Sequence, residues 1–246
     1  MASTSWIDMT YWDSIVTPQA TVAVVQTGNS TTRPPGACIV SKTAIDGKVS
    51  YTTIAQCTAL LPTTSDVRTI FIHPGTYNEQ LTFNRSGATI FQGYAEDPTK
   101  YSTNQVIITN SAGVDTQGDA SNSDSATFYS RGKNVKFYNI NLVNTFGKAA
   151  DYASLAFSVG NNGNASFYGC QILGNQDTFN VNVGASAFTY NTYIEGSIDF
   201  IWGSGSMYFL ASMMAPNTNG ISITADKRAT NTLLGDRVLG CIKLDC

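Results

Sequence analysis

The chain has 246 residues, of which only 13% are charged, and its formal net charge is −3. It contains no basic cluster and no run of 18 apolar residues. These features argue against nucleic acid as a partner and against a membrane-spanning helix. The length suits one large domain or two small ones, and we expect a monomer.

The N-terminal segment, residues 1–37, is expected to be irregular, because TTRPPG marks a loop. Its opening stretch, MASTSWIDMTYWDSIV, lacks a positive region and an apolar region, so no signal peptide is recognisable. The N-x-S/T sequons at Asn29, Asn84 and Asn164 would suit a secreted protein, although chance matches are common in a chain rich in Asn and Ser.

Metal chemistry is not expected, and neither is a cofactor. Five cysteines leave at least one unpaired, no C-x-x-C motif occurs, and His73 is the single histidine. His73 precedes a Pro-Gly turn and is interpreted as a strand end without a catalytic role. Hydrolytic chemistry in this chain would therefore depend on carboxylates.

One helix is predicted, within residues 50–62, where Pro62 ends the pattern SYTTIAQCTALLP. Its apolar face is expected to contain Ile54, Cys57, Leu60 and Leu61. Short strands follow in VRTIFIHPG, EQLTF, ATIFQGY and NQVIITNSA, separated by Gly, Asn and Asp. GVDTQGDASNSDS is then expected to be a polar loop.

The second half of the chain repeats itself. Similar nine-residue patterns occur at 137–145, 167–175, 189–197 and 209–217, so they begin 30, 22 and 20 residues apart. Alternation within each pattern indicates a strand, and recurrence at this interval indicates stacked coils. Because these intervals leave no room for crossover helices, we predict an all-β fold, a parallel β-helix with one short N-terminal helix. A β-sandwich is the alternative, since Asn-Gly turn signals also occur.

Two aspartates share the period of the repeats. Asp177 in GNQDTFN and Asp199 in GSIDFIWG are 22 residues apart, so stacked coils would place them side by side, about 4.8 Å apart. Two carboxyl groups that close cannot both ionise easily, which prepares one as nucleophile or base and the other as proton donor. The neighbouring Gln176 offers an uncharged donor for an oxyanion. The alternative is that these aspartates only cap turns.

The aromatic residues beside Asp199 are harder to place. Trp202 and Phe200 are candidates for an apolar platform under a sugar ring, or else for core packing. In a regular strand Ile201 would share the face of Asp199, whereas Phe200 and Trp202 would face the opposite way. A bend at Gly203 would break this alternation.

Four motifs in chain order, HPGTYNEQL, GNQDTF, GSIDFIWG and ITADKR, resemble those of the fungal pectin methylesterases, or pectinesterases. The resemblance extends from about Cys38 to Arg228. It implies a right-handed single-stranded parallel β-helix over residues 38–228, between the irregular segment 1–37 and a divergent tail 229–246. It also implies a secreted carboxylic ester hydrolase that needs no metal and acts on pectin.

The resemblance assigns roles to individual residues. Asp199 matches the nucleophile, Asp177 matches the general acid and base, and Gln176 matches the glutamine that stabilises the oxyanion. Thr127 in SATF resembles a substrate-contacting threonine, and Trp202 is the candidate platform for the sugar. Tyr77 and Glu79 match the GTYNE motif, whose role is taken as structural.

Two departures from the family pattern are expected to weaken activity. Ala153 in ASLAF stands where the family has a glutamine, and losing one oxyanion donor costs about 2.7–4 kcal/mol of transition-state stabilisation. The family also continues to an LGRPW-like motif that holds substrate and nucleophile, and Arg237 in LGDR does not match it. We therefore expect a truncated chain with weak esterase activity or none.

Two other hypotheses remain for this fold. A non-catalytic pectin-binding β-helix would retain binding without turnover. A polysaccharide lyase or glycosidase would cleave the polymer, whereas an esterase releases methanol without shortening it. A lyase would need a calcium-binding carboxylate cluster and a basic Lys or Arg, which the candidate turns lack.

Overall fold

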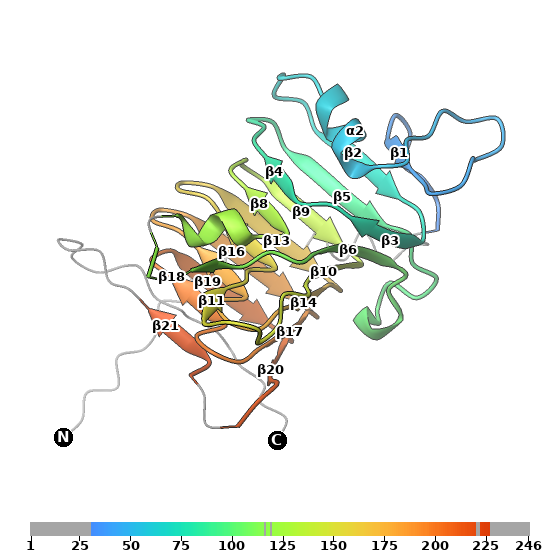
Figure 1. Ribbon diagram of the computed structural model, residues 1–246. Helices are drawn as coiled ribbons and strands as arrows, with labels where there is room; N and C mark the ends of the chain where they lie inside the picture. Colours follow the sequence, from blue (N-terminus) through green and yellow to red (C-terminus); the bar gives the residue numbers. More distant parts are fainter. Residues whose placement is uncertain (1–30, 116, 119, 220–221, 227–246) are drawn as a thin grey trace, which may run out of the picture.

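The protein is described by a computed structural model that covers residues 31–115, 117–118, 120–219 and 222–226. The chain winds through three parallel sheets in turn, and successive coils stack from the α2 end to the β21 end (Figure 1). The segment 1–30 and the tail 229–246 lie outside the described residues, as do Arg237 and the last two cysteines.

The sheets are named A, B and C in the order in which each coil visits them. Sheet A contains β1 (Cys38–Val40), β2 (Arg68–Ile72), β5 (Thr89–Gly93), β9 (Val135–Tyr138), β13 (Asn164–Tyr168), β16 (Ser186–Tyr190) and β19 (Ser206–Leu210). Sheet B contains β3 (Gly75–Asn78), β6 (Val106–Asn110), β10 (Ile140–Asn144), β14 (Gln171–Leu173), β17 (Tyr193–Gly196) and β20 (Met213–Pro216). Sheet C contains β4 (Leu81–Phe83), β8 (Phe128–Ser130), β12 (Phe157–Val159), β15 (Phe179–Val181), β18 (Ile201–Gly203) and β21 (Thr224–Asp226).

The predicted β-helix and its repeat are confirmed. Phe137 pairs with Phe167, and Thr189 pairs with both Phe167 and Phe209, so the four predicted repeats lie in register on successive coils. All ladders within sheets A, B and C are parallel, which excludes the β-sandwich. Parallel strands joined by crossovers wind almost always in the right-handed sense.

The elements that do not belong to the three sheets lie at the end of the coils or in the long loops. Among the described residues they are the helix α2 (Ile54–Leu60), the 3₁₀ turns η1 (Tyr101–Thr103) and η2 (Asn122–Ser125), and an antiparallel pair of β7 (Val114–Asp115) with β11 (Tyr152–Ala153). The polar loop predicted from GVDTQGDASNSDS thus contains β7 and η2. No helix in the described ranges is long and apolar enough to cross a membrane.

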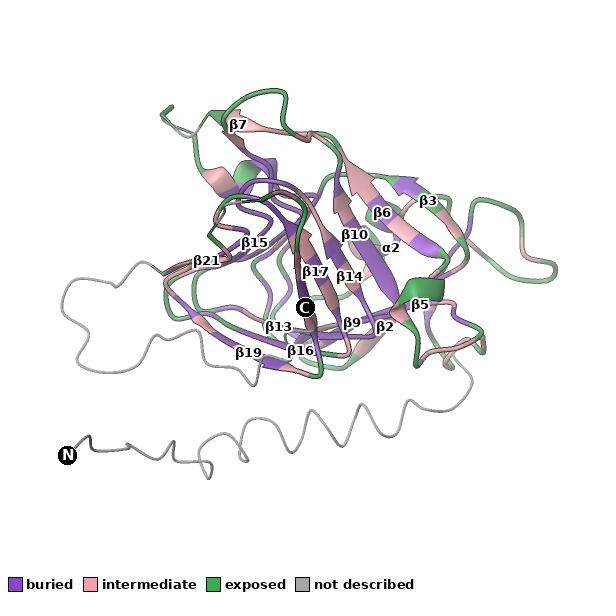
Figure 2. Cartoon of the chain, turned by 90° about the horizontal axis from the view of Figure 1, so that it is seen from below, coloured by how far each residue is buried: buried purple, intermediate pink, exposed green. Residues whose placement is uncertain are grey.

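Stacked phenylalanines fill the interior of the coils. Phe91, Phe137 and Phe167 lie on successive coils of sheet A, with ring centroids 5.0 and 5.2 Å apart and nearly parallel planes. Phe128 and Phe157 repeat this stacking in sheet C and meet the first stack edge-on. The sheets are buried along their strands, whereas exposed residues gather in the connecting loops (Figure 2). On the coils from β5 to β13, these stacked rings help to fix the register of the strands and so the positions of the loops between them.

The predicted helix forms, but one of its expected core residues is wrong. Thr53 and Gln56 make a capping box at its start, and Ile54 and Cys57 are buried. Leu60 is 57% exposed, because six residues of α-helix place it about 120° around the axis from Ile54. The helix is tied to the first strand of sheet A by a disulfide between Cys57 and Cys38.

Glu79 stabilises the start of this helix from the neighbouring coil. Its two carboxylate oxygens accept hydrogen bonds from the backbone N–H groups of Ile54, at 2.8 Å, and Ala55, at 2.9 Å. These are two of the donors that a helix leaves unpaired at its N-terminus, where negative charge is favoured. Tyr77 of the same motif is buried, and its hydroxyl donates to the backbone carbonyl of His73. Both contacts fit the structural role that we assigned to the GTYNE motif.

The Glu79→Gln variant is expected to lose about 1–2 kcal/mol of unfolding free energy, because a neutral amide has only one acceptor oxygen for the two N–H groups. Urea unfolding monitored by circular dichroism measures this loss. Glu96→Gln removes an exposed carboxylate elsewhere and serves as the matched control. Equal stability of the two variants would contradict the capping role.

Candidate functional site

The two aspartates lie on consecutive short turns between sheets B and C. Phe179 pairs with Ile201, so Asp177 and Asp199, each two residues earlier, occupy equivalent positions on adjacent coils. The backbone N–H of Asp177 donates to the carbonyl of Ile198 at 2.9 Å, which joins the two turns directly. The structure therefore brings together the pair that the 22-residue spacing predicts.

Both aspartates adopt the left-handed backbone conformation, with φ of 60° at Asp177 and 48° at Asp199. Asp tolerates this region better than most residues do. The conformation also explains why the expected alternation is wrong. Phe200 and Ile201 are both fully buried, and Trp202, which we expected opposite Asp199, lies on the outer side. A left-handed residue just before a strand breaks the two-residue period on which the prediction relied.

A glycine three residues before each aspartate lets the turns pack closely. A Cβ atom at Gly196 would lie 2.2 Å from the Cβ of Phe200, and one at Gly174 would lie 2.7 Å from the Oγ1 of Thr178. Neither position has room for a side chain unless its neighbours shift. The G-x-x-D pattern in both turns is thus a packing requirement of the site.

Asp177 is arranged to hold a proton near neutral pH. Burial, which leaves it 8% exposed, raises its pKa to about 7, and the charge on Asp199 adds to this effect. The side-chain amide of Asn122 donates to its Oδ2 at 3.0 Å and opposes the rise, and a third carboxylate, Asp151, adds a small upward effect. A carboxyl group with this pKa can both give and accept a proton at neutral pH.

Trp202 stabilises the turn that carries Asp177. Its indole Nε1–H donates to the backbone carbonyl of Asp177 at 3.0 Å, and its ring packs against a buried cluster formed by Ala126, Ala153 and Leu155. Ala153, the residue that departs from the family pattern, is fully buried in this cluster. The suggested role of Trp202 as a platform for a sugar stays a prediction.

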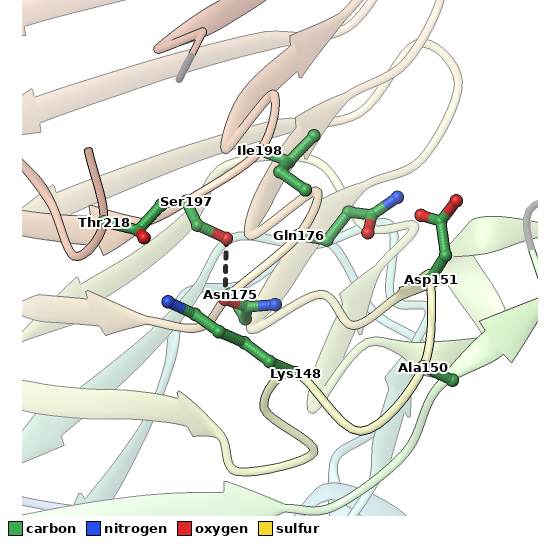
Figure 3. Close-up of a pocket in the computed structure, with 8 residues that line it drawn as sticks. All are labelled: Lys148, Ala150, Asp151, Asn175, Gln176, Ser197, Ile198 and Thr218. Atoms are coloured by element: carbon green, nitrogen blue, oxygen red, sulfur yellow. Dashed lines mark hydrogen bonds between the residues drawn. The ribbon is translucent and has the colours of Figure 1, made fainter. Parts of the chain in front are cut away.

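Gln176 borders an open pocket of about 500 Å³ beside the two turns (Figure 3). The side chain is nearly buried, with 8% exposure, and in Figure 3 its amide points toward Asp151. The residues that line the pocket are Lys148, Ala150, Asp151, Asn175, Gln176, Ser197, Ile198 and Thr218.

Thr127 contacts the backbone between sheets B and C. Its side chain is fully buried, and its hydroxyl donates to the backbone carbonyl of Val143 at 2.9 Å. Thr127 immediately precedes β8, and its N–H also bonds to Leu155 on the next coil. These contacts give Thr127 a structural role between sheets B and C, and its predicted contact with a substrate stays a prediction.

Sequence reasoning missed Asn122, Asp151 and Lys148. Each belongs to one of the long B–C loops of the two preceding coils, which overhang the short turns of Asp177 and Asp199. The contact between Asn122 and Asp177 joins residues 55 positions apart. Loops of irregular length carry no periodic signal, so the sequence gives no indication of this contact.

The Asn122→Ala variant is expected to raise the pKa of Asp177 further, because it removes a hydrogen bond that favours the charged carboxylate. A carboxyl titration followed by carbon NMR would measure the change. Asn161→Ala, at an exposed turn between sheets C and A, is the matched control. An unchanged midpoint in the Asn122 variant would show that this amide does not influence Asp177.

The sequence model described as Pectinesterase matches residues 39–235. The chain is 38% identical over 199 residues to Pectinesterase A of Emericella nidulans, covering 81% of this chain and 58% of that protein. It is 35% identical over 207 residues to a Pectinesterase of Aspergillus aculeatus, covering 82% of this chain and 60% of that protein.

A solved structure shows the same architecture. The pectin methylesterase from Aspergillus niger superposes with a TM-score of 0.71 at 31% identity, covering 81% of this chain and 63% of that one. The chain thus spans about 58–60% of the length of the two curated relatives named above. The resemblance predicted from four short motifs is confirmed by similarity along most of the chain, and this protein belongs to the pectinesterase family.

Proposed function

We propose that this protein hydrolyses the methyl esters of homogalacturonan, the polymer of pectin, to pectate and methanol. The observation that carries the proposal is the in-register pair of aspartates, one of which has a pKa of about 7. Family membership supports the same reaction, since relatives that share most of this chain are named as pectinesterases.

In the first step, a carboxylate oxygen of Asp199 attacks the ester carbonyl carbon. Negative charge then develops on the carbonyl oxygen, where the Gln176 amide donates a hydrogen bond without neutralising the aspartates. The bond to the methoxy oxygen breaks, and the leaving group takes the proton of Asp177 to become methanol. The product is an acid anhydride between the galacturonate and Asp199.

In the second step, the now ionised Asp177 removes a proton from water, and the hydroxide attacks the acyl carbon. The bond to the Asp199 oxygen breaks, which restores its carboxylate and gives a galacturonic acid that loses its proton to solvent. The proton taken from water restores the acid form of Asp177, so the cycle is balanced without a metal or cofactor. A pKa of about 7 suits both its acid and its base roles.

One observation favours an alternative, a catalytically inactive β-helix that binds pectin. Ala153 replaces the glutamine expected from the family pattern, and its methyl group is packed among Ala126, Leu155 and Trp202. Gln176 is then the one glutamine left of the two that the family pattern places at the oxyanion, so slow turnover or none is the expectation. Binding and catalysis are separable by experiment.

We further propose that the protein is secreted and that residues 38–228 form the pectinesterase-like domain. The disulfide between Cys38 and Cys57 supports an oxidising compartment, because such bonds are rare in the cytosol. The third described cysteine, Cys170, is buried with a raised thiol pKa, which leaves it inert.

The test combines two measurements on highly methylated pectin. Methanol release is expected to rise with time, while the viscosity and chain length of the polymer stay unchanged. A fall in chain length would support a glycosidase or a lyase instead. Binding to pectin without any methanol release would support the inactive alternative.

A further inference from the structure

A buried polar cluster lies on the outer face of sheet C, close to the turn of Asp177. Ser158 on β12 pairs with Asn180 on β15, and both alternate with core residues, so their side chains face away from the core. They are nevertheless fully buried, and Ser123 of η2, which meets them there, is 5% exposed. Ser123, Ser158 and Asn180 are called the serine–asparagine cluster below.

Hydrogen bonds join the three side chains. The hydroxyl oxygens of Ser123 and Ser158 lie 2.9 Å apart, and the side-chain amide of Asn180 donates to the hydroxyl of Ser158 at 3.1 Å. The amide oxygen of Asn180 is buried without a hydrogen-bond partner among the described residues, which costs free energy. An apolar side chain of the same shape would avoid this cost, so packing alone does not explain an amide at this position.

The cluster joins the same two segments as the contact between Asn122 and Asp177. Ser123 directly follows Asn122 in η2, and Asn180 lies three residues after Asp177. The side-chain amide of Asn122 donates to the Oδ2 of Asp177 at 3.0 Å. The two attachments lie close together along both segments, so the buried one restricts the movement of the other.

The far end of η2 is held by separate contacts. The carbonyl of Asp124 accepts from the side chain of Gln80 at 2.7 Å, and that of Ser125 accepts from the side chain of Asn144 at 3.0 Å. The end that carries Asn122 is attached to sheet C through the cluster.

The charged groups near Asp177 are not members of the cluster. Asp199 on the next turn and Asp151 in the neighbouring loop both raise the pKa of Asp177. The loop of Asp151 also carries Lys148, and η2 carries the exposed Asp124. A substitution in the cluster therefore leaves all these charges in place.

We propose that the serine–asparagine cluster positions η2 so that Asn122 keeps its hydrogen bond to Asp177. This inference rests on the proposed function, in which Asp177 is the acid and the base. The bond from Asn122 favours the ionised carboxylate and so opposes the effect of burial. The cluster thereby helps to set the pH range in which Asp177 can both give and accept a proton.

The experiment uses the full chain and begins with Ser158→Ala, which removes the hydroxyl that the other two members contact. Ser212→Ala is the matched control, because it removes a buried hydroxyl that lies 2.9 Å from that of Thr189 in a turn between sheets A and B. The carboxyl of Asp177, titrated by carbon NMR, is expected to have a higher midpoint in Ser158→Ala and an unchanged midpoint in Ser212→Ala. Both variants should lose similar stability in urea, so a merely structural role predicts no difference between their titrations.

The double variant Asn122→Ala/Ser158→Ala tests whether the cluster acts through Asn122. Its midpoint is expected to equal that of Asn122→Ala, because the hydrogen bond to Asp177 is already absent there. Shifts that add independently, or an unchanged midpoint in Ser158→Ala, would each overturn the proposal.

Asn180→Leu provides a second variant that serves if Ser158→Ala does not fold. It keeps the shape of the side chain and removes the unpaired oxygen, so it should be at least as stable as the wild-type protein and still raise the midpoint of Asp177. A wild-type midpoint in this variant would contradict the positioning role. In an active enzyme, the alkaline limb of kcat/KM should move to higher pH together with the midpoint. A raised midpoint without methanol release from the wild-type protein would support the positioning role and reject the esterase proposal.

Discussion

Replacing Asp177 with asparagine is expected to raise the free energy of unfolding at pH 8 by up to about 4 kcal/mol, while abolishing turnover. The pKa of Asp177 rises from 3.8 to about 7 on folding, chiefly because the carboxyl group is buried. At pH 8 the folded protein must therefore keep a charge in a site that disfavours it. Asparagine removes that charge and can still accept the hydrogen bond from Asn122.

The dependence on pH has a definite sign. A carboxyl group with a raised pKa holds its proton more tightly in the folded state, so stability falls as pH rises from about 4 to about 7. Below this window Asp177 is protonated in both states and the variant gains little. The stabilisation by Asp177→Asn should therefore be small near pH 4 and approach its full value near pH 8.

Urea unfolding at several pH values between 4 and 8 measures this effect. The Asp46→Asn variant, which alters an exposed carboxylate at the opposite end of the coils, controls for the loss of one charge. If Asp177→Asn and Asp46→Asn follow the same pH curve, the proton is not held as inferred. An inactive but more stable protein is the outcome that fits a group retained for catalysis at a cost in stability.

The positions of Asp177 and Asp199 could be predicted because the two residues recur with the repeat of the coils. Asp177 and Asp199 are separated by one coil, and each follows a glycine by three residues, so their juxtaposition follows from the repeat. Stacked phenylalanines hold the register as far as the coil of Asp177, and paired apolar residues such as Phe179 and Ile201 carry it to the coil of Asp199. Periodic information in a solenoid sequence is therefore sufficient to place the pair.

The remainder of the site depends on departures from that period. Trp202 takes its position from the left-handed backbone at Asp199, and a count of alternating residues cannot anticipate this change. For Thr127, a short motif does not reveal whether the hydroxyl faces solvent or a backbone carbonyl, here that of Val143. Asn122 reaches Asp177 through the path of a long loop, which only the folded structure reveals.

The Asp199→Asn variant is expected to lower methanol release by at least roughly a thousandfold, because an amide is a poor nucleophile and cannot form the anhydride. The same change removes a negative charge from beside Asp177, so it should also lower the pKa of that residue and weaken the pH dependence of stability. This second effect is measurable even where turnover is slow. It separates a chemical role for Asp199 from a merely structural one.

The control again is Asp46→Asn, which should keep both the turnover and the pH dependence of the wild-type protein. Pectin affinity, measured by calorimetry, should be unchanged in Asp199→Asn if the variant remains folded. Methanol release at the wild-type rate would reject Asp199 as the nucleophile. If the stability of Asp199→Asn depends on pH as that of the wild-type protein does, the two carboxylates do not interact. The charge of Asp199 would then no longer explain part of the raised pKa of Asp177, on which its acid–base role depends.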